Sequence, residues 1–162
     1  MATKLTKEQA KALLDAYEKQ QTAATNASIA AYNKEVDADV KATETEIAAE
    51  KQKAQITADT VIDRAAVQAL IERRQIAEAI SNLGLSRSGV AASADESISR
   101  RRLVSENNAT AAKRASLSAL SQRLVTAREQ AAAKKEKNAA AARKTLNSKI
   151  AEKKLTLDKA TV

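Results

Sequence analysis

The stretch Asn82-Leu83-Gly84-Leu85-Ser86-Arg87-Ser88-Gly89-Val90 decides the fold, because it holds both glycines of a 162-residue chain that contains no proline. The sequence on either side is rich in strong helix formers. Gly84 can adopt the left-handed conformation that ends a helix, and Leu85 can fold back as the hydrophobic partner of a Schellman motif. We therefore predict an all-α fold, in which two long helices joined by this turn form an antiparallel, coiled-coil-like hairpin.

The first helix is predicted over about 7–83. Thr6 and Gln9 have the spacing of a capping box, with Thr6 as the N-cap, so a helix is expected to begin next to them. The stretch 22–28 is weaker, because its Thr, Asn and Ser side chains compete for backbone hydrogen bonds. This stretch allows a kink or a short break.

The second helix is predicted over about 94–157, after a turn over 84–92. Ser93 and Glu96 repeat the capping-box pattern and favour a helix start there. Gly89 permits a second unusual backbone angle. The chain as a whole, 1–162, is thus expected to be a single elongated hairpin.

Apolar residues of the first helix recur in steps of three and four, which places them on one stripe. They are Ile29, Tyr32, Val36, Val40, Ile47, Ala54, Ala58, Val61, Ala65, Ala69, Ile76, Ile80 and Leu83. Val67, Leu70 and Ile71 widen the stripe and predict the densest packing near the turn. The mean step lies between the 3.5 and 3.67 repeats, which leaves the supercoil hand open. Because such a thin seam supplies little core, we expect the hairpin to assemble into a homo-oligomer.

Composition excludes several classes of function. The chain has no Cys and no His, so the common zinc, haem and iron–sulfur ligand sets are absent, as are Ser–His and Cys–His nucleophile systems. The sequence predicts no catalytic, cofactor-binding or metal-binding residue, and no enzymatic role. It has no apolar run of about 18 residues, and its N-terminus lacks the apolar core of a signal peptide. We expect a protein made in the cytoplasm, without a membrane partner.

Charge is unevenly distributed. Residues 1–80 carry 11 basic and 13 acidic side chains, whereas 90–162 carry 16 basic and 7 acidic ones. The net charge is +8, and it resides in the second half of the chain. Acidic helices, acidic neighbouring subunits and nucleic acid are all plausible counterparts.

Arginines gather at the turn end of the hairpin, namely Arg64, Arg73, Arg74, Arg87, Arg100, Arg101 and Arg102. One interpretation is contact with phosphate or with an acidic subunit, since guanidinium groups make bidentate contacts. The other is a solvated helix face with ion pairs inside the chain, for which Glu72, Glu78, Asp95 and Glu96 are near enough in sequence. Both interpretations stay open. Gly84, Leu85, Arg87 and Gly89 are predicted to form a hinge and contact tip.

A second basic segment contains Lys134, Lys135 and Lys137, which are candidates for contact with phosphate or with an acidic partner. The segment has no recognition motif, and the chain has almost no aromatic residues to stack on bases. A solvated helix face at a subunit interface is therefore favoured there. The carboxylates of 35–50 spread around a helix, so they predict a charged surface or a partner for a basic helix.

The central segment resembles a known family. Val67-Gln68-Ala69-Leu70-Ile71-Glu72-Arg73-Arg74-Gln75-Ile76-Ala77-Glu78, followed by Asn82–Val90, is similar to small helical proteins of tailed bacteriophages and of prophages in Gram-positive bacteria. Their shared pattern is a helix with an Arg–Gln pair, then N-(L/M)-G-L-(S/T)-x-S-G-(L/V), then a polar second helix. The resemblance covers roughly 60–110, and the outer arms match only in composition and helical character. The chain departs from the pattern by carrying Arg87 and the Arg100–Arg102 run, which make the turn end more basic.

The resemblance implies a virion or virion-assembly protein without enzymatic activity. The expected protein is a structural component packing in many copies, as a ring-like homo-oligomer, at the portal or head–tail region. Its partners would be other copies of itself, portal or head–tail proteins, and packaged DNA. Two alternatives remain. One is a DNA-associated basic helical protein, or an internal, ejected virion protein like the helical hairpins of short-tailed phages. The other is an assembly scaffold or chaperone that leaves the mature particle.

Overall fold

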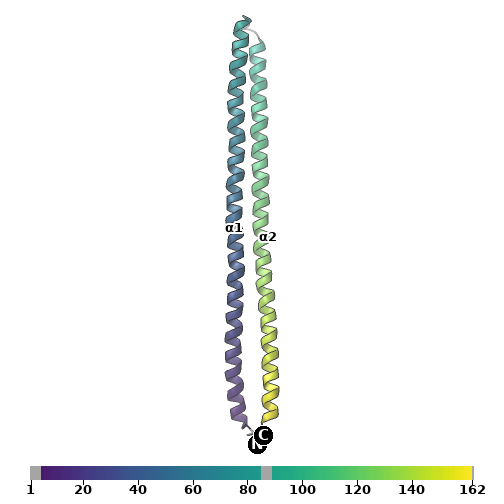
Figure 1. Ribbon diagram of the computed structural model, residues 1–162. Coiled ribbons are helices and arrows are strands. Elements are labelled where there is room, and N and C mark those ends of the chain that lie inside the picture. Colours follow the sequence, from purple (N-terminus) through teal and green to yellow (C-terminus); the bar gives the residue numbers. More distant parts are fainter. Residues whose placement is uncertain (1–4, 85–88, 162) are drawn as a thin grey trace. The chain divides into compact units, whose positions relative to one another are not determined.

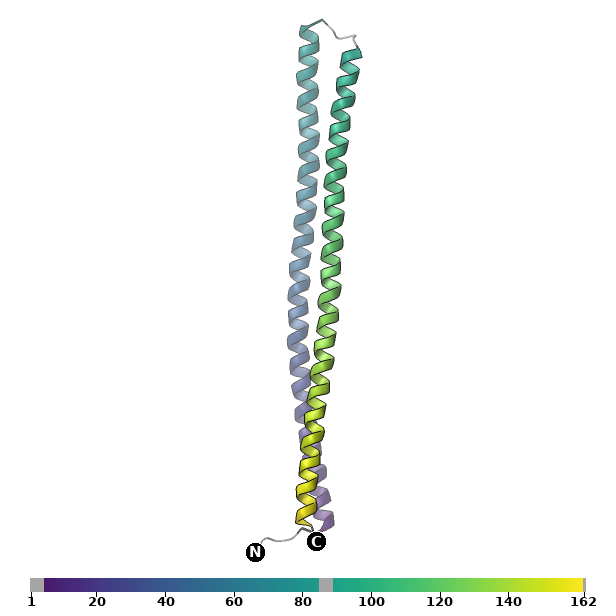
Figure 2. The ribbon, with the colours of Figure 1, turned by 90° about the vertical axis from the view of Figure 1, so that its right-hand side faces the viewer.

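The computed structural model describes residues 5–84 and 89–161. Two helices, α1 (Lys7–Asn82) and α2 (Gly89–Ala160), pack against each other as a hairpin (Figures 1 and 2), and the described residues contain no strand. The predicted all-α hairpin is therefore confirmed. The chain divides into two compact units. We call Glu44–Leu124 the turn unit, and Met1–Thr43 with Val125–Val162 the terminal unit.

The start of α1 is a capping box, as predicted. The backbone N–H of Gln9 donates to the Thr6 hydroxyl over 3.3 Å, and the backbone N–H of Thr6 donates to the Gln9 side-chain oxygen over 3.0 Å. Two backbone donors that the first turn of a helix would leave unpaired are thereby satisfied. The helix accordingly begins at Lys7.

No break occurs at 22–28, because α1 runs through this stretch as α-helix. Gln21, Thr25 and Ile29 are half-buried at steps of four, which places them on one side of α1. Burial of this side outweighs the weak helix propensity of Thr, Asn and Ser, since packing routinely overrides propensity.

Gly84 ends α1 as predicted. Its φ is +67°, in the left-handed region, and its N–H donates to the Ser81 carbonyl over 3.1 Å. This bond is the inner one of a Schellman motif whose C′ residue is Gly84. The expected roles of Leu85 and Arg87 at the contact tip lie outside the described residues.

The start of α2 differs from the prediction. The helix begins at Gly89, so 89–92 belong to α2 and not to the turn, and the predicted cap at Ser93 is wrong. Ser93 lies inside α2 and its hydroxyl donates to the Val90 carbonyl over 3.1 Å. Gly89 has no positive φ, so the second unusual backbone angle is absent. Ala91, Ala94 and Ile98 continue one inward stripe, and this packing extends the helix upstream of Ser93.

The end of α2 lies beside the start of α1 in the terminal unit. The helix continues to Ala160, slightly past the predicted end. The Leu5 N–H donates to the Ala160 carbonyl over 3.2 Å, and Leu5 forms an isolated parallel bridge with Thr161. The Thr161 hydroxyl donates to the carbonyls of Asp158 and Leu157. These bonds satisfy part of the last turn of α2 and fix the two chain ends together.

The core of the hairpin follows an 11-residue period. On α1 the most buried side chains of 36–80 are those of Val36, Ile47, Ala58, Ala69 and Ile80, at intervals of 11. On α2 the same interval of 11 connects Ile98, Ala109, Leu120, Ala131 and Ala142. Ile98, Ala109 and Ala131 are buried, and Leu120 and Ala142 are half-buried. Eleven residues span about three turns at 3.67 residues per turn, a period associated with right-handed supercoiling. The structure thus resolves the ambiguity of period that the sequence leaves open.

The predicted dense packing of Val67, Leu70 and Ile71 is wrong. These side chains are 55%, 63% and 46% exposed, whereas Ala69 between them is 5% exposed. The core interval of Ala58, Ala69 and Ile80 turns one side of α1 toward α2. The three larger residues lie on other sides of the same turns.

Candidate interaction site

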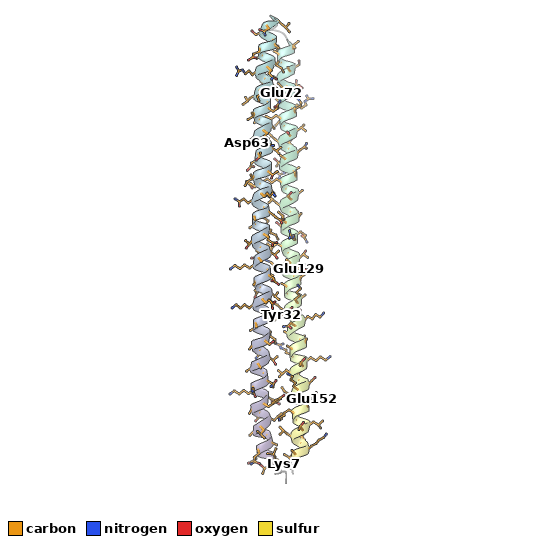
Figure 3. All side chains as sticks on the ribbon, viewed as in Figure 1. Lys7, Tyr32, Asp63, Glu72, Glu129 and Glu152 are labelled. Carbon is orange, nitrogen blue, oxygen red and sulfur yellow. The ribbon has the colours of Figure 1, made fainter. Side chains whose placement is uncertain are left out.

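The arginines of the turn unit are joined to acids across the two helices. Arg73 Nε lies 2.6 Å from Asp95 Oδ1, and an Nη of Arg73 donates to the Ser99 hydroxyl over 2.8 Å. The Nε–H of Arg73 has no hydrogen-bond acceptor, so its contact with Asp95 acts through charge. Arg101 lies 2.9 Å from Glu72, which faces α2 and is 26% exposed (Figure 3).

Other arginines pair along a single helix. Arg74 contacts Glu78 at 3.0 Å, Arg100 contacts Glu96 at 2.8 Å, and Arg102 contacts Glu106 at 2.9 Å, each at a spacing of four residues. Pairs of this kind contribute about 0.3–0.5 kcal/mol each. They hold the guanidinium groups on the surface of the turn unit without adding much stability.

The interpretation of the arginines as ion pairs inside the chain is therefore confirmed for Arg73, Arg74 and the Arg100–Arg102 run, whereas Arg64 makes no ion pair within the described residues. All four acids expected as partners, Glu72, Glu78, Asp95 and Glu96, are in contact with an arginine. Binding of phosphate by Arg100, Arg101 and Arg102 would have to compete with these carboxylates. It stays a prediction.

The lysines of the terminal unit likewise face acids of their own chain. Lys135 Nζ contacts Asp37, and Lys134 and Lys137 line a shallow groove with Glu35 and Asp39. Acids of 35–50 thus serve as partners for the basic second helix. In the turn unit, Glu46 and Glu50 act in the same way toward Arg123, at 3.9 and 3.3 Å. A contact of Lys134, Lys135 and Lys137 with an external phosphate or acidic partner stays a prediction.

The two tyrosines, Tyr17 and Tyr32, are half-buried in the terminal unit. The ammonium of Lys153 lies 5.6 Å from the centroid of the Tyr17 ring, within the range of a cation–π contact. Tyr17 therefore connects α1 to α2.

The turn unit carries exposed apolar residues that were not predicted from the sequence. Twelve large apolar side chains are exposed among the described residues, and nine of them belong to the turn unit. The nine are Ile56, Val61, Val67, Leu70, Ile71, Leu83, Val90, Leu103 and Val104. The 11-residue period would have revealed them in the sequence. When 56–83 are arranged with that period, the buried alanines fall on one side of α1 and the exposed apolar residues fall on the others.

The described residues contain no group of three or more acidic, His or Cys side chains that could hold a metal ion. In the part of the chain that the structure describes, no helix has the length and apolar character needed to cross a membrane.

Comparisons with models of protein families, with curated proteins and with solved structures give no match. The family resemblance therefore stays a prediction.

Proposed function

We propose that this chain is a structural component of a tailed-phage virion, a helical hairpin that packs in several copies at the portal or head–tail region. The observation that carries the proposal is the motif Asn82–Val90. Its Gly84 ends α1 with the left-handed angle that such a pattern needs. The motif thus has a structural role, the joining of two helices.

Packing in several copies is supported by the surface of the turn unit. Exposed apolar residues scattered singly are normal, but neighbouring ones on one stripe of a helix, such as Val67 and Leu70, mark a candidate interaction site. Among the described residues, nine such side chains lie in Glu44–Leu124 and three in the terminal unit, which has the same length. We therefore assign contact with other copies or with a portal protein to the turn unit.

The proposal is tested on purified particles of the phage that encodes the chain. Mass spectrometry of mature, DNA-filled virions should detect the chain in several copies, and a map of the intact particle should locate it at the portal or head–tail region. If the chain is present in empty precursor shells but absent from mature virions, it is an assembly scaffold or chaperone, and the proposal fails.

A second candidate function, binding to packaged DNA, is favoured by the charge of the terminal unit. Residues 125–162 carry ten Lys or Arg and four Asp or Glu. Binding to a short DNA duplex should weaken as salt rises, with log K falling linearly against log salt concentration. Absence of binding at low salt would remove this candidate.

A further inference from the structure

We infer that the exposed side of α1 over 63–74 is a two-fold symmetric contact, at which a second copy of this chain binds antiparallel. The proposed function requires a contact between copies, and the site on α1 is where we place that contact. In this one respect the inference rests on the proposed function. The residues that carry it are Asp63, Val67, Leu70 and Arg74. We call them the α1 seam.

The α1 seam is turned away from the core of the hairpin. Val67 and Leu70 are 55% and 63% exposed, while Ala69 is buried. Figure 3 shows Asp63 on the side of α1 opposite α2. Steps of four, three and four residues separate Asp63, Val67, Leu70 and Arg74, so the four side chains share one stripe of the helix. Asp63 and Val67 border an open groove whose lining includes one α2 residue, Ser105.

The order of chemistry along the α1 seam is self-complementary. It runs acid, apolar, apolar, base, and its spacing is the same in both directions. Two copies placed antiparallel about an axis between residues 68 and 69 bring each Val67 opposite the other copy's Leu70. The same operation brings each Asp63 opposite the other copy's Arg74. It also brings each Asp59 opposite the other copy's Glu78, and these two acids are already paired within their own chain, with Lys113 at 4.0 Å and with Arg74 at 3.0 Å. A closed two-fold interface has this property, since residue i contacts j and j contacts i.

The charged side chains at the two ends of the α1 seam are exposed. Among the described residues, Arg74 is bound only by Glu78 from its own helix, and the side chains of this pair are 83% and 63% exposed. Asp63 is exposed and has no ion pair within the described residues. A parallel arrangement would instead place Asp63 beside Asp63 and Arg74 beside Arg74. Because like charges in contact are unfavourable, the antiparallel arrangement is preferred.

The first test is sedimentation velocity of the full chain at concentrations on the order of 1 to 100 µM, where a contact of this size should dissociate. Leu70→Lys should raise the dissociation constant by at least about 30-fold, since a central apolar residue is lost from both copies. Leu155→Lys is the matched control, because Leu155 is 57% exposed and lies in the terminal unit. It should leave the dissociation constant unchanged. A chain that is monomeric at every concentration, or an association that Leu70→Lys does not weaken, overturns the inference.

Charge reversal tests the symmetry. Asp63→Arg alone and Arg74→Asp alone should each weaken association by about tenfold, because each leaves like charges opposite one another. The double variant should restore it, because exchanging the two charges keeps the pattern self-complementary. Circular dichroism shows whether each variant keeps its helices. A double variant that is folded and as weak as the single variants overturns the antiparallel arrangement.

Cross-linking gives a test that does not depend on stability, because the chain has no cysteine of its own. Ile56→Cys should not cross-link to itself, since about 37 Å would separate the two positions at 1.5 Å per residue. A mixture of Ile56→Cys and Ser81→Cys chains should cross-link, because these positions lie opposite one another. Self-cross-linking of Ile56→Cys indicates a parallel pair and overturns the inference. Detection of the chain in virions is independent of these results, so the proposed function can stand if the α1 seam fails.

Discussion

The turn unit and the terminal unit have the same length and the same pairing of α1 with α2, but they differ in what they bury and what they expose. The turn unit buries the two most enclosed large side chains, Ile47 at 1% and Ile98 at 2% exposure. It also carries nine of the twelve large apolar side chains that are exposed among the described residues. The terminal unit buries Ala10, Val36, Ala131 and Leu157, and its α2 segment is rich in lysine.

This difference separates two tasks of the apolar residues. Residues at an interval of 11 pair the helices; the alanines among them let the backbones approach closely, and Ile47 and Ile98 supply the largest buried side chains. The large apolar residues of the turn unit that lie off that interval and are exposed contribute little to the pairing. Their concentration on the turn unit therefore indicates a surface for assembly.

The largest effect is expected from the core of the turn unit. Ile47→Ala should lower the free energy of unfolding by about 3 kcal/mol, because it removes a fully buried side chain and leaves a cavity. Ile56→Ala is the matched control, since Ile56 is 57% exposed, and it should change stability by less than about 0.5 kcal/mol. Urea denaturation followed by circular dichroism measures both. Equal losses in the two variants would contradict the 11-residue core.

The turn should respond oppositely at its two glycines. Gly84→Ala should cost about 1–2 kcal/mol, because an L-residue is strained at φ +67°. Gly89→Ala should instead stabilise by about 0.5 kcal/mol, because Gly89 is helical and nothing lies within 4 Å of an added Cβ. Thermal unfolding of the two variants side by side gives the sign of each change. A loss of stability in Gly89→Ala would contradict a helix start at that residue.

The cap of the terminal unit should have a smaller and local effect. Thr6→Ala should cost about 1 kcal/mol, since it removes the acceptor for the Gln9 N–H. Amide hydrogen exchange should show faster opening of the first turn of α1, with the turn unit unaffected. Thr57→Ala is the control, because its hydroxyl bonds only to the Lys53 carbonyl of its own helix. It should not speed exchange.

The cross-helix ion pairs should have the smallest effect. A double-mutant cycle with Glu72→Gln and Arg101→Gln should give a coupling energy of about 0.5–1 kcal/mol that falls with added salt. The same cycle on Asp37 and Lys135 in the terminal unit should give a similar value. A coupling that is large in only one unit would show that the pairs, and not the apolar interval, distinguish the two units.

Features set by local chemistry could be predicted from the sequence. The bonds between Thr6 and Gln9 need only four neighbouring residues, and the left-handed angle of Gly84 needs only a glycine after a helix. Both were predicted, and both are present. The acids that bind the arginines were also within reach, because two of the four lie one helical turn from their partner.

Features set by packing between the helices could not be predicted with the same certainty. Ser93 has the pattern of a cap, but Ala91 and Ala94 pack inward and draw the helix start upstream. Leu70 and Val67 are as apolar as any core residue, and only the pairing with α2 decides which stripe of α1 is covered. That pairing depends on residues far away in the sequence, so an apolar face and an unpaired face look alike until the partner helix is in place.

The bridge between Leu5 and Thr161 has a mechanical consequence. When load is applied between the two ends of the terminal unit, it acts across the helix pair and not along it. Contacts then open one after another, as a zip does, and never have to break all at once. Of the four buried side chains described in the terminal unit, two are those of alanines (Ala10 and Ala131), so each step releases few contacts and the terminal unit should yield at low force and re-form readily. The helices of the terminal unit can therefore separate and re-pair under load while the turn unit stays bound to its partner.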